Sequence, residues 1–351
     1  MNNLEKQNQI GYFQFIDRLP FLSKLKIWNR SSKKDTVVPP FWVMVQKEVS
    51  DQVRSWRFVI LIGIIALTCF GSMYASLSSI GKAIKPNDPE GTFFFLKLFT
   101  LSDGTIPAFF IFIGFLGPLL GISLGFDAIN SEHNKGTLSR VLSQPIHRDY
   151  VINAKFVASL IVISAMLFAL GFLVMGLGLI AIGIPPSAVE FLRVISFIVL
   201  SIIYVAFWLN LSILFSVCFR QPATSALSGI AIWLFFTVFY PLIVNLIAKI
   251  SAPSEMASAH QVAAYERIIN VLMQLLPNQL FSEATTTLLM PSIRSLGPLS
   301  MEQLYGAVPG PLPLSQSLLL VWPQVTGLIA ATLLCFVASY VLFMRREIRS
   351  R

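Results

Sequence analysis

Residues 156–189 read FVASLIVISAMLFALGFLVMGLGLIAIGIPPSAV, a run of 34 residues that contains no Asp, Glu, Lys or Arg. About 20 apolar residues are enough for a helix to cross the hydrocarbon core of a bilayer. The run is longer than one perpendicular span, but it leaves no room for a polar turn that would divide it in two. It predicts one membrane-spanning helix that tilts, or that ends at the interface near Ile184, Pro185 and Pro186.

The rest of the chain contains five more runs of this kind. Hydrophobic residues make up 55% of the 351 residues and charged residues only 12%, and the mean hydropathy is +0.72. Because these values lie far from those of soluble proteins, we predict an all-α polytopic membrane protein with six transmembrane helices. The other predicted spans are residues 58–81, 104–126, 194–219, 221–248 and 324–344.

The charge distribution predicts the orientation of the chain. There are 26 Lys and Arg against 17 Asp and Glu, a formal net charge of +9. If both termini lie on one side of the membrane, 19 basic residues fall on that side and seven on the other. The positive-inside rule then places both termini of a multi-pass cell (plasma or inner) membrane protein in the cytoplasm. Because the lipid bilayer accounts for the basic charge, we expect no nucleic-acid partner.

These spans define the predicted organisation of the whole chain. No short apolar core followed by a small-residue cleavage site occurs near the N-terminus, so we expect no removable signal peptide. The predicted parts are a basic cytoplasmic tail (1–40), an amphipathic elbow helix (41–57), spans 1 to 5 (58–248) with a cytoplasmic coupling loop (127–155), an extracytoplasmic helical loop (249–323), span 6 (324–344) and a cytoplasmic tail (345–351).

The extracytoplasmic loop contains two helical patterns. Apolar residues recur with a helical period between Glu255 and Leu276, and the pattern stops at Pro277. A second short helix is predicted to begin with Asn278 as its cap and to end before Pro291. We therefore expect a small outer cap of short helices between spans 5 and 6.

The six runs themselves contain no ionisable residue. This argues against a proton- or sodium-coupled transporter and against an intramembrane metalloprotease. The sequence also lacks the G-x-x-x-x-G-K-[ST] phosphate loop, so we expect no ATP site of that type on this chain. The three cysteines all lie within apolar runs and favour neither a disulfide framework nor a thiolate metal cluster. We predict no catalytic, cofactor-binding or metal-binding residues.

Span 2 carries a stripe of glycines at Gly117, Gly121 and Gly125. Small residues four apart let two membrane helices approach closely. The stripe is either ordinary helix packing within one subunit or part of a dimer interface at a transport path.

Before span 1, apolar residues recur at spacings of three and four from Trp42 to Trp56, with charged residues on the other faces. This pattern predicts an amphipathic helix that lies in the membrane interface. It can serve as a simple anchor, as a functional elbow, or as both.

The loop between spans 2 and 3 reads DAINSEHNKGTLSRVLSQPIHRDYVINAK over residues 127–155. Residues 136–143 can form a short helix that ends before Pro145, because the residue before a proline disfavours helix. The segment is either a rigid lever that receives force from a partner or a solvated turn.

This loop resembles the one between spans 2 and 3 in the permease subunits of type-2 ABC exporters. The resemblance covers residues 41–351 and rests on degenerate motifs. In the loop they are Glu132, Gly136-Thr137-Leu138, Leu142, Ser143-Gln144-Pro145-Ile146, Arg148 and Lys155. Before span 1 they are Lys47-Glu48, Asp51, Arg54-Ser55 and Arg57, and in the outer loop Leu276-Pro277-Asn278, residues 281–285 and residues 288–291.

The resemblance implies a permease that works with a separate P-loop ABC ATPase subunit and a second permease copy or homologue. ATP and Mg would then bind to the ATPase and no cofactor to this chain. Residues 132–143 would be the coupling helix, and a path at the dimer interface would be lined by spans 1, 2 and 5. The implied ATPase-coupling residues are Glu132, Gly136, Thr137, Leu138, Val141, Leu142, Pro145 and Arg148, and the implied elbow residues are Trp42, Lys47, Glu48, Asp51, Arg54 and Arg57.

The sequence is compatible with more than one cargo and more than one function. Uncharged spans and 29 phenylalanines are compatible with export of a hydrophobic or amphiphilic compound such as a drug, lipid or peptide. One alternative is a membrane scaffold or force-transmitting subunit of an ABC-type assembly that exports no solute. Another is a lipid-modifying enzyme, whose acid and base groups would come from Asp127, Glu132, His133 and His147.

Overall fold

The computed structural model describes residues 39–83, 93–102, 104–144, 146–183, 185–253, 258–291 and 312–345. These residues form helices, with no strand among them. Six of the helical segments are long and apolar enough to cross a membrane, which confirms the predicted fold class. The predicted basic tail, apart from its last two residues, and residues 346–351 of the C-terminal tail lie outside the described residues.

Three short helices accompany the first three spans. The first spanning segment lies in α4, the second runs through α6 and α7, and the third is α9. The helices are α3 (Pro40–Val53), α4 (Trp56–Ala83), α5 (Phe94–Thr100), α6 (Phe109–Gly125), α7 (Asn130–Asn134), α8 (Thr137–Leu142) and α9 (Arg148–Ile182).

The second half of the chain contains the other three spans and a helical pair between the last two. Span 4 is α10, span 5 runs from α11 through the π-helix η3 to α12, and span 6 is α16. The elements are α10 (Ala188–Cys218), α11 (Pro222–Leu234), η3 (Phe235–Phe239), α12 (Tyr240–Ile250), α13 (Ala259–Gln274), α14 (Pro277–Leu289) and α16 (Leu314–Arg345).

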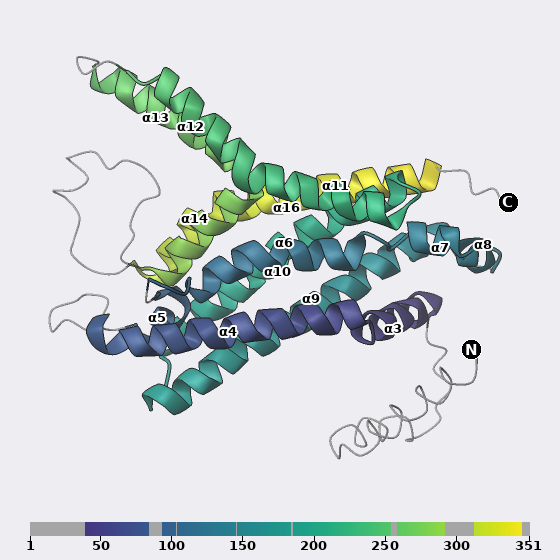
Figure 1. Cartoon of the computed structure of the whole chain (residues 1–351), viewed down its shortest axis with the longest axis horizontal. Helices are drawn as coiled ribbons and strands as arrows, with labels where there is room; N and C mark the ends of the chain where they lie inside the picture. The colour runs from purple at the N-terminus through teal and green to yellow at the C-terminus, as the bar shows by residue number, and fades with distance from the viewer. Residues whose placement is uncertain are drawn as a thin grey trace. The chain divides into compact units, whose positions relative to one another are not determined.

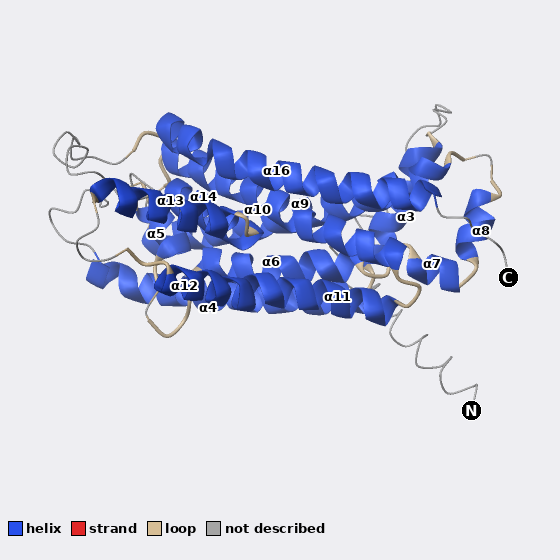
Figure 2. Cartoon of the chain, turned by 90° about the horizontal axis from the view of Figure 1, so that it is seen from above, coloured by secondary structure: helices blue, strands red, loops and turns tan. Residues whose placement is uncertain are grey.

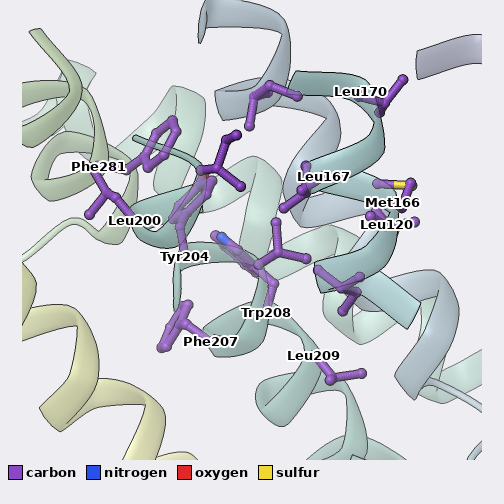
Figure 3. Close-up of a cluster of buried hydrophobic side chains, with 14 of the residues drawn as sticks. Leu120, Met166, Leu167, Leu170, Leu200, Tyr204, Phe207, Trp208, Leu209 and Phe281 are labelled. Carbon is purple, nitrogen blue, oxygen red and sulfur yellow. The ribbon is translucent and has the colours of Figure 1, made fainter. Parts of the chain in front are cut away.

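Helix α10 lies at the centre of the unit formed by residues 40–351, as both views show (Figures 1 and 2). It packs most extensively against α6 and α16, and also against α9, α11 and α14. Tyr204, Trp208 and Leu209 on this helix are fully buried, and they lie in one apolar cluster with Leu120 and Phe281 (Figure 3). The core is therefore built around span 4.

The glycine stripe of span 2 lies in this contact between α6 and α10. A Cβ atom on Gly121 would lie 2.8 Å from the carbonyl oxygen of Val205, and one on Gly125 would lie 2.8 Å from that of Leu209. A Cβ atom on Gly117 would meet the Val205 side chain at 3.0 Å. Of the two interpretations given above, the structure places the stripe in helix packing within the chain.

The elbow helix ends earlier than predicted. Helix α3 stops at Val53, and Trp56 and Arg57 already belong to the spanning helix α4. The cause is Ser55, whose Oγ accepts a hydrogen bond from the backbone N–H of Phe58 at 3.3 Å. A serine that caps a free N–H in this way starts a new helix, so the chain turns there.

The spanning helices are longer than the uncharged runs and include ionisable residues. Lys155 lies in α9, and Glu190 and Arg193 lie in α10. All three side chains are buried. The uncharged runs are thus shorter than the helices that contain them, and these three buried charges lie directly beyond the ends of the runs.

Arg193 and Glu190 join the end of α10 to three other elements. Arg193 Nη1 donates to the carbonyl oxygen of Leu288 at 2.8 Å and to Ser317 Oγ at 3.1 Å, at the adjoining ends of α14 and α16. Glu190 accepts a hydrogen bond from the backbone N–H of Phe95 in α5 at 2.9 Å. Helix α5 and both of these contacts were absent from the sequence-based prediction.

The helices between spans 5 and 6 do not simply cap the bundle. Helix α14 packs between α6, α10 and α16, and it starts at Pro277 with Leu276, rather than Asn278, at the cap position. Asn278 Oδ1 lies 2.6 Å from the hydroxyl of Tyr204, which is in the middle of α10. The first turn of α14 therefore reaches back to mid-length of span 4.

The α6–α10 contact generates a test of the fold. Gly121→Ala should destabilise the protein by about 2 kcal/mol, because overpacking a tight contact forces the backbones apart. Gly176→Ala is the matched control, since nothing lies within 4 Å of the added atom and alanine favours helix. Thermal unfolding in detergent measures both variants. A Gly121→Ala protein as stable as the Gly176→Ala protein would contradict the close packing.

Candidate coupling site

Helices α3, α7 and α8 lie together at one end of the bundle, whereas α5 lies at the other end (Figures 1 and 2). The first turns of α9 lie against α3 at the same end. Both segments that the sequence singled out, the elbow and the loop between spans 2 and 3, are therefore brought together.

Lys155 joins three of these helices. Its Nζ lies 3.0 Å from Glu48 Oε2 on α3 and 2.8 Å from Glu132 Oε1 on α7. The Lys155 side chain is 7% exposed, and those of Glu48 and Glu132 are 13% and 17% exposed. We call these three residues the Lys155 triad. Paired charges shielded from water interact more strongly than exposed ones, so the triad fixes α3 and α7 on α9.

Two further cations form ion pairs at this end of the bundle, and one of them contacts the triad. Lys47 Nζ lies 3.0 Å from Glu48 Oε1 and 3.8 Å from Glu132 Oε1. Arg57, at the start of α4, pairs with Asp127 at 2.6 Å, and its guanidinium lies 5.1 Å from the centre of the Phe126 ring. Arg57 therefore ties span 1 to the end of span 2.

The triad shifts the pKa values of the elbow residues. Burial by itself would raise the pKa of Glu48, but the positive charges of Lys155 and then Lys47 hold it below its ordinary value. Burial would lower the pKa of Lys47, but the charge of Glu48 and its hydrogen bond to Lys47 raise it. Both side chains are therefore held in their charged forms.

Small residues on α9 let the elbow helix approach closely. Val45 packs against Ala154 and Ala158, which are fully buried. Two turns after Val45 on α3, Gln52 Nε2 donates to Ser159 Oγ at 2.6 Å. Glu48 lies between these two contacts on α3, so the same packing directs its carboxylate toward Lys155.

The loop after span 2 forms two short helices instead of the one that was predicted. Gly136 separates α7 from α8 with a left-handed φ of +67°, a conformation that glycine adopts without strain. The start of α7 is fixed to the end of α10, because Ser216 Oγ accepts hydrogen bonds from the backbone N–H groups of Ile129 and Asn130. A lever built from this loop is thus anchored at its base.

The apolar side of α8 faces the protein itself. Leu138 is 2% exposed, and Val141 packs partly buried against the same core cluster. Thr137 and Arg140 are exposed instead. Leu138, one of the predicted ATPase-coupling residues, therefore packs on its own chain.

A cavity of about 630 Å³ lies between α3, α7 and α8. Each of its four lining carboxylates is paired with a cation. Lys135 and Arg140 also line it and are exposed, and neither has a carboxylate partner among the described residues. The acids of the lining are Glu48, Asp51, Asp127 and Glu132.

The remaining predicted coupling and elbow residues that the structure describes do not line this cavity. For two others, the residue or its side chain is not described by the structure. Arg148 donates to the carbonyl oxygen of Phe343 at 2.6 Å, so it joins α9 to the end of α16. Trp42 and Arg54 are exposed on the outside of the elbow. Pro145 lies outside the described residues, as does the Leu142 side chain.

Lys155 belongs to the motif of residues 127–155, but the sequence did not predict it as a residue of the site. Its signal was a lone lysine directly before the longest uncharged run. A charge at that position must find a partner on a neighbouring helix. Among the described residues, no group of three or more His, Cys, Asp or Glu side chains could hold a metal ion.

The ion pairs of the Lys155 triad should contribute to the free energy of unfolding. Lys155→Met keeps the length of the side chain but leaves two shielded carboxylates without their central cation, and it should cost about 3 kcal/mol. The triple variant Lys155→Met, Glu48→Gln, Glu132→Gln removes the uncompensated charges and should regain most of this loss. Chemical unfolding in detergent measures both. Equal losses in the two variants would show that charge pairing is not what holds α3 and α7.

The lowered pKa of Glu48 should make the stability of the protein depend on pH. A carboxylate whose pKa is lower in the folded than in the unfolded protein contributes stability that is complete above the unfolded pKa and is lost as the pH falls through the folded pKa. Between pH 6 and pH 3 the wild-type midpoint of unfolding should therefore fall more steeply than that of Glu48→Gln. Parallel curves for the two proteins would contradict the assignment.

Comparisons with known proteins identify the family of this chain. Residues 42–348 match the ABC-2 family transporter protein family. The chain is 24% identical over 216 residues to "Probable ABC transporter permease protein NosY" of Pseudomonas aeruginosa. The aligned residues cover 61% of this chain and 73% of that protein. It is 25% identical over 214 residues to the protein of the same description from Stutzerimonas stutzeri, with 60% and 71% covered. The chain belongs to the ABC-2 transporter family and is a permease subunit, a class of subunit that lacks an ATPase domain and on which no cofactor is expected.

Proposed function

We propose that this permease exports a hydrophobic or amphiphilic compound, such as a drug, lipid or peptide, through a path between two permease subunits. Both termini lie in the cytoplasm, and the second subunit is a copy of this chain or a homologue. A P-loop ATPase docks on the end formed by α3, α7 and α8. The uncharged runs and the excess of basic residues on one side of the spans support this assignment.

The observation that carries the proposal is the Lys155 triad. A force applied to α7 and α8 reaches span 3 through Lys155, the elbow through Glu48 and span 4 through Ser216. Conformational coupling requires an element whose contacts differ between two states. A short helical pair anchored to two spans and the elbow has the construction that a rocking mechanism needs.

The charges on the cavity indicate how the ATPase is recognised. Lys135 and Arg140 are exposed cations without a carboxylate partner among the described residues, whereas the acids of the cavity are already paired. Interface charges are arranged to be complementary, and unpaired ones steer association. The ATPase surface that meets this cavity should therefore be acidic.

This docking is tested with the double variant Lys135→Glu, Arg140→Glu. We expect it to lower the amount of ATPase that copurifies with the tagged chain in mild detergent at least tenfold, because like charges would then meet. Arg54→Glu is the matched control, since Arg54 is an exposed cation that does not line the cavity. Quantitative mass spectrometry with an ATPase assay gives the result. Equal recovery in all three proteins contradicts acidic docking, and absence of any ATPase with the wild type contradicts the proposed function.

The class of cargo is tested on the reconstituted complex. Hydrophobic substrates of an exporter should stimulate its ATPase, so a panel of phospholipids, apolar peptides and amphiphilic dyes should contain members that raise the rate at least twofold. A water-soluble sugar of similar mass serves as the control. No stimulation by any apolar compound would favour a force-transmitting subunit that exports no solute.

A further inference from the structure

Span 2 has a break in its backbone hydrogen bonding at mid-length. Pro118 lies inside α6 and has no N–H, so the carbonyl oxygen of Gly114 four residues earlier loses its helical donor. Tyr204 Oη lies 2.9 Å from this oxygen and donates to it from α10. A polar backbone group within a span needs a partner inside the protein, and Tyr204 supplies it.

Span 5 is irregular in the same region. Its helix widens to a π-turn at Phe235–Phe239, and the N–H of Tyr240 donates to the carbonyl oxygen of Phe235 five residues back. Pro241 follows directly, so Thr237 occupies the position four residues before a proline, as Gly114 does in span 2. Turns of this type occur frequently at functional positions of helices.

Asn278 connects these two irregular turns. Its Nδ2 donates to Thr237 Oγ1 at 2.7 Å, and its Oδ1 lies 2.6 Å from the hydroxyl of Tyr204. An amide side chain carries a donor and an acceptor, so one residue can hold two hydroxyl groups. The Tyr204 hydroxyl has one proton, which it shares between Asn278 and Gly114.

The surroundings of this chain of hydrogen bonds are apolar. The ring of Phe281, one turn beyond Asn278, stacks on the Tyr204 ring with centroids 4.3 Å apart (Figure 3), and it lies 3.4 Å from a Cβ atom built on Gly114. Spans 2 and 5 also touch directly through Phe115 and Trp233, whose ring centroids are 5.0 Å apart. Hydrogen bonds in such a setting are costly to break without replacement.

We propose that Asn278 is a positioning residue for transport. It ties the hinge of span 2, through Tyr204, to the hinge of span 5, through Thr237, so that the two spans change conformation together. Proline-interrupted helices bend at defined points, and a connection between two such points makes their bending concerted. This inference rests on the proposed coupling to an ATPase, which would drive the change.

The test is hydrogen–deuterium exchange of the permease–ATPase complex, without nucleotide and after trapping with ATP and vanadate. In the wild type, exchange in residues 109–125 and 235–245 should change together, by threefold or more. Thr237→Val removes the hydroxyl from the connection at nearly constant shape. It should leave the change in residues 109–125 and abolish the change in residues 235–245.

Two variants separate this role from a purely structural one. Thr237→Ser retains a hydroxyl and should restore the concerted change. Thr332→Val is the matched control, because Thr332 also lies in a span but donates only to Leu328 of its own helix at 2.7 Å, and it should behave as the wild type.

The outcomes are distinguishable from those of the proposed function. A wild-type complex without nucleotide-dependent exchange in either span contradicts the ATP-driven function and this inference with it. A wild-type complex with concerted exchange, together with a Thr237→Val variant that retains it, contradicts the role of Asn278 alone. If Thr237→Val lowers the melting temperature and Thr237→Ser does not restore concerted exchange, Asn278 is structural and the inference is wrong.

Discussion

The close contact between α6 and α10 is the constraint on which the rest of the structure depends. Within a bilayer, lipid tails are as apolar as the side chains, so helices associate through tight packing and hydrogen bonds rather than through removal of apolar surface from water. Gly121 and Gly125 let α6 approach the backbone of α10. That approach brings Tyr204 within reach of the Gly114 carbonyl and leaves α10 enclosed by its neighbours.

The buried charges mark the two ends of this arrangement. At one end, Lys155 gathers the carboxylates of α3 and α7. At the other end, Arg193 holds backbone carbonyls at the adjoining ends of α14 and α16, while Glu190 holds the start of α5. A charge that is removed from water must be paired or hydrogen-bonded. Each of these residues therefore fixes the short helices of its end onto a spanning helix, and the intervening spans remain apolar.

Between the two ends, the same rule acts on the backbone. Prolines in spans 2 and 5 remove N–H donors, and the carbonyl groups that they leave must be satisfied by other parts of the chain. The first turn of α14 reaches the middle of the bundle and brings Asn278 to that depth. A segment that the sequence suggested as an outer cap thus contributes to the interior, and the irregular turns that would weaken a single helix become points of connection.

The sequence by itself determined the six spans, the all-helical class and the family, because hydropathy over 20 residues and the motif around Gly136 are local properties. It also indicated the two segments, residues 41–57 and 127–155, that lie together at one end of the spans. The tertiary structure decided which charges meet. Lys155 lies 107 residues from Glu48 along the chain, and no local pattern specifies such a pair. It likewise decided that Leu138 packs inward and that Asn278 reaches Tyr204, because burial and hydrogen bonding depend on neighbours that only the packed helices bring together.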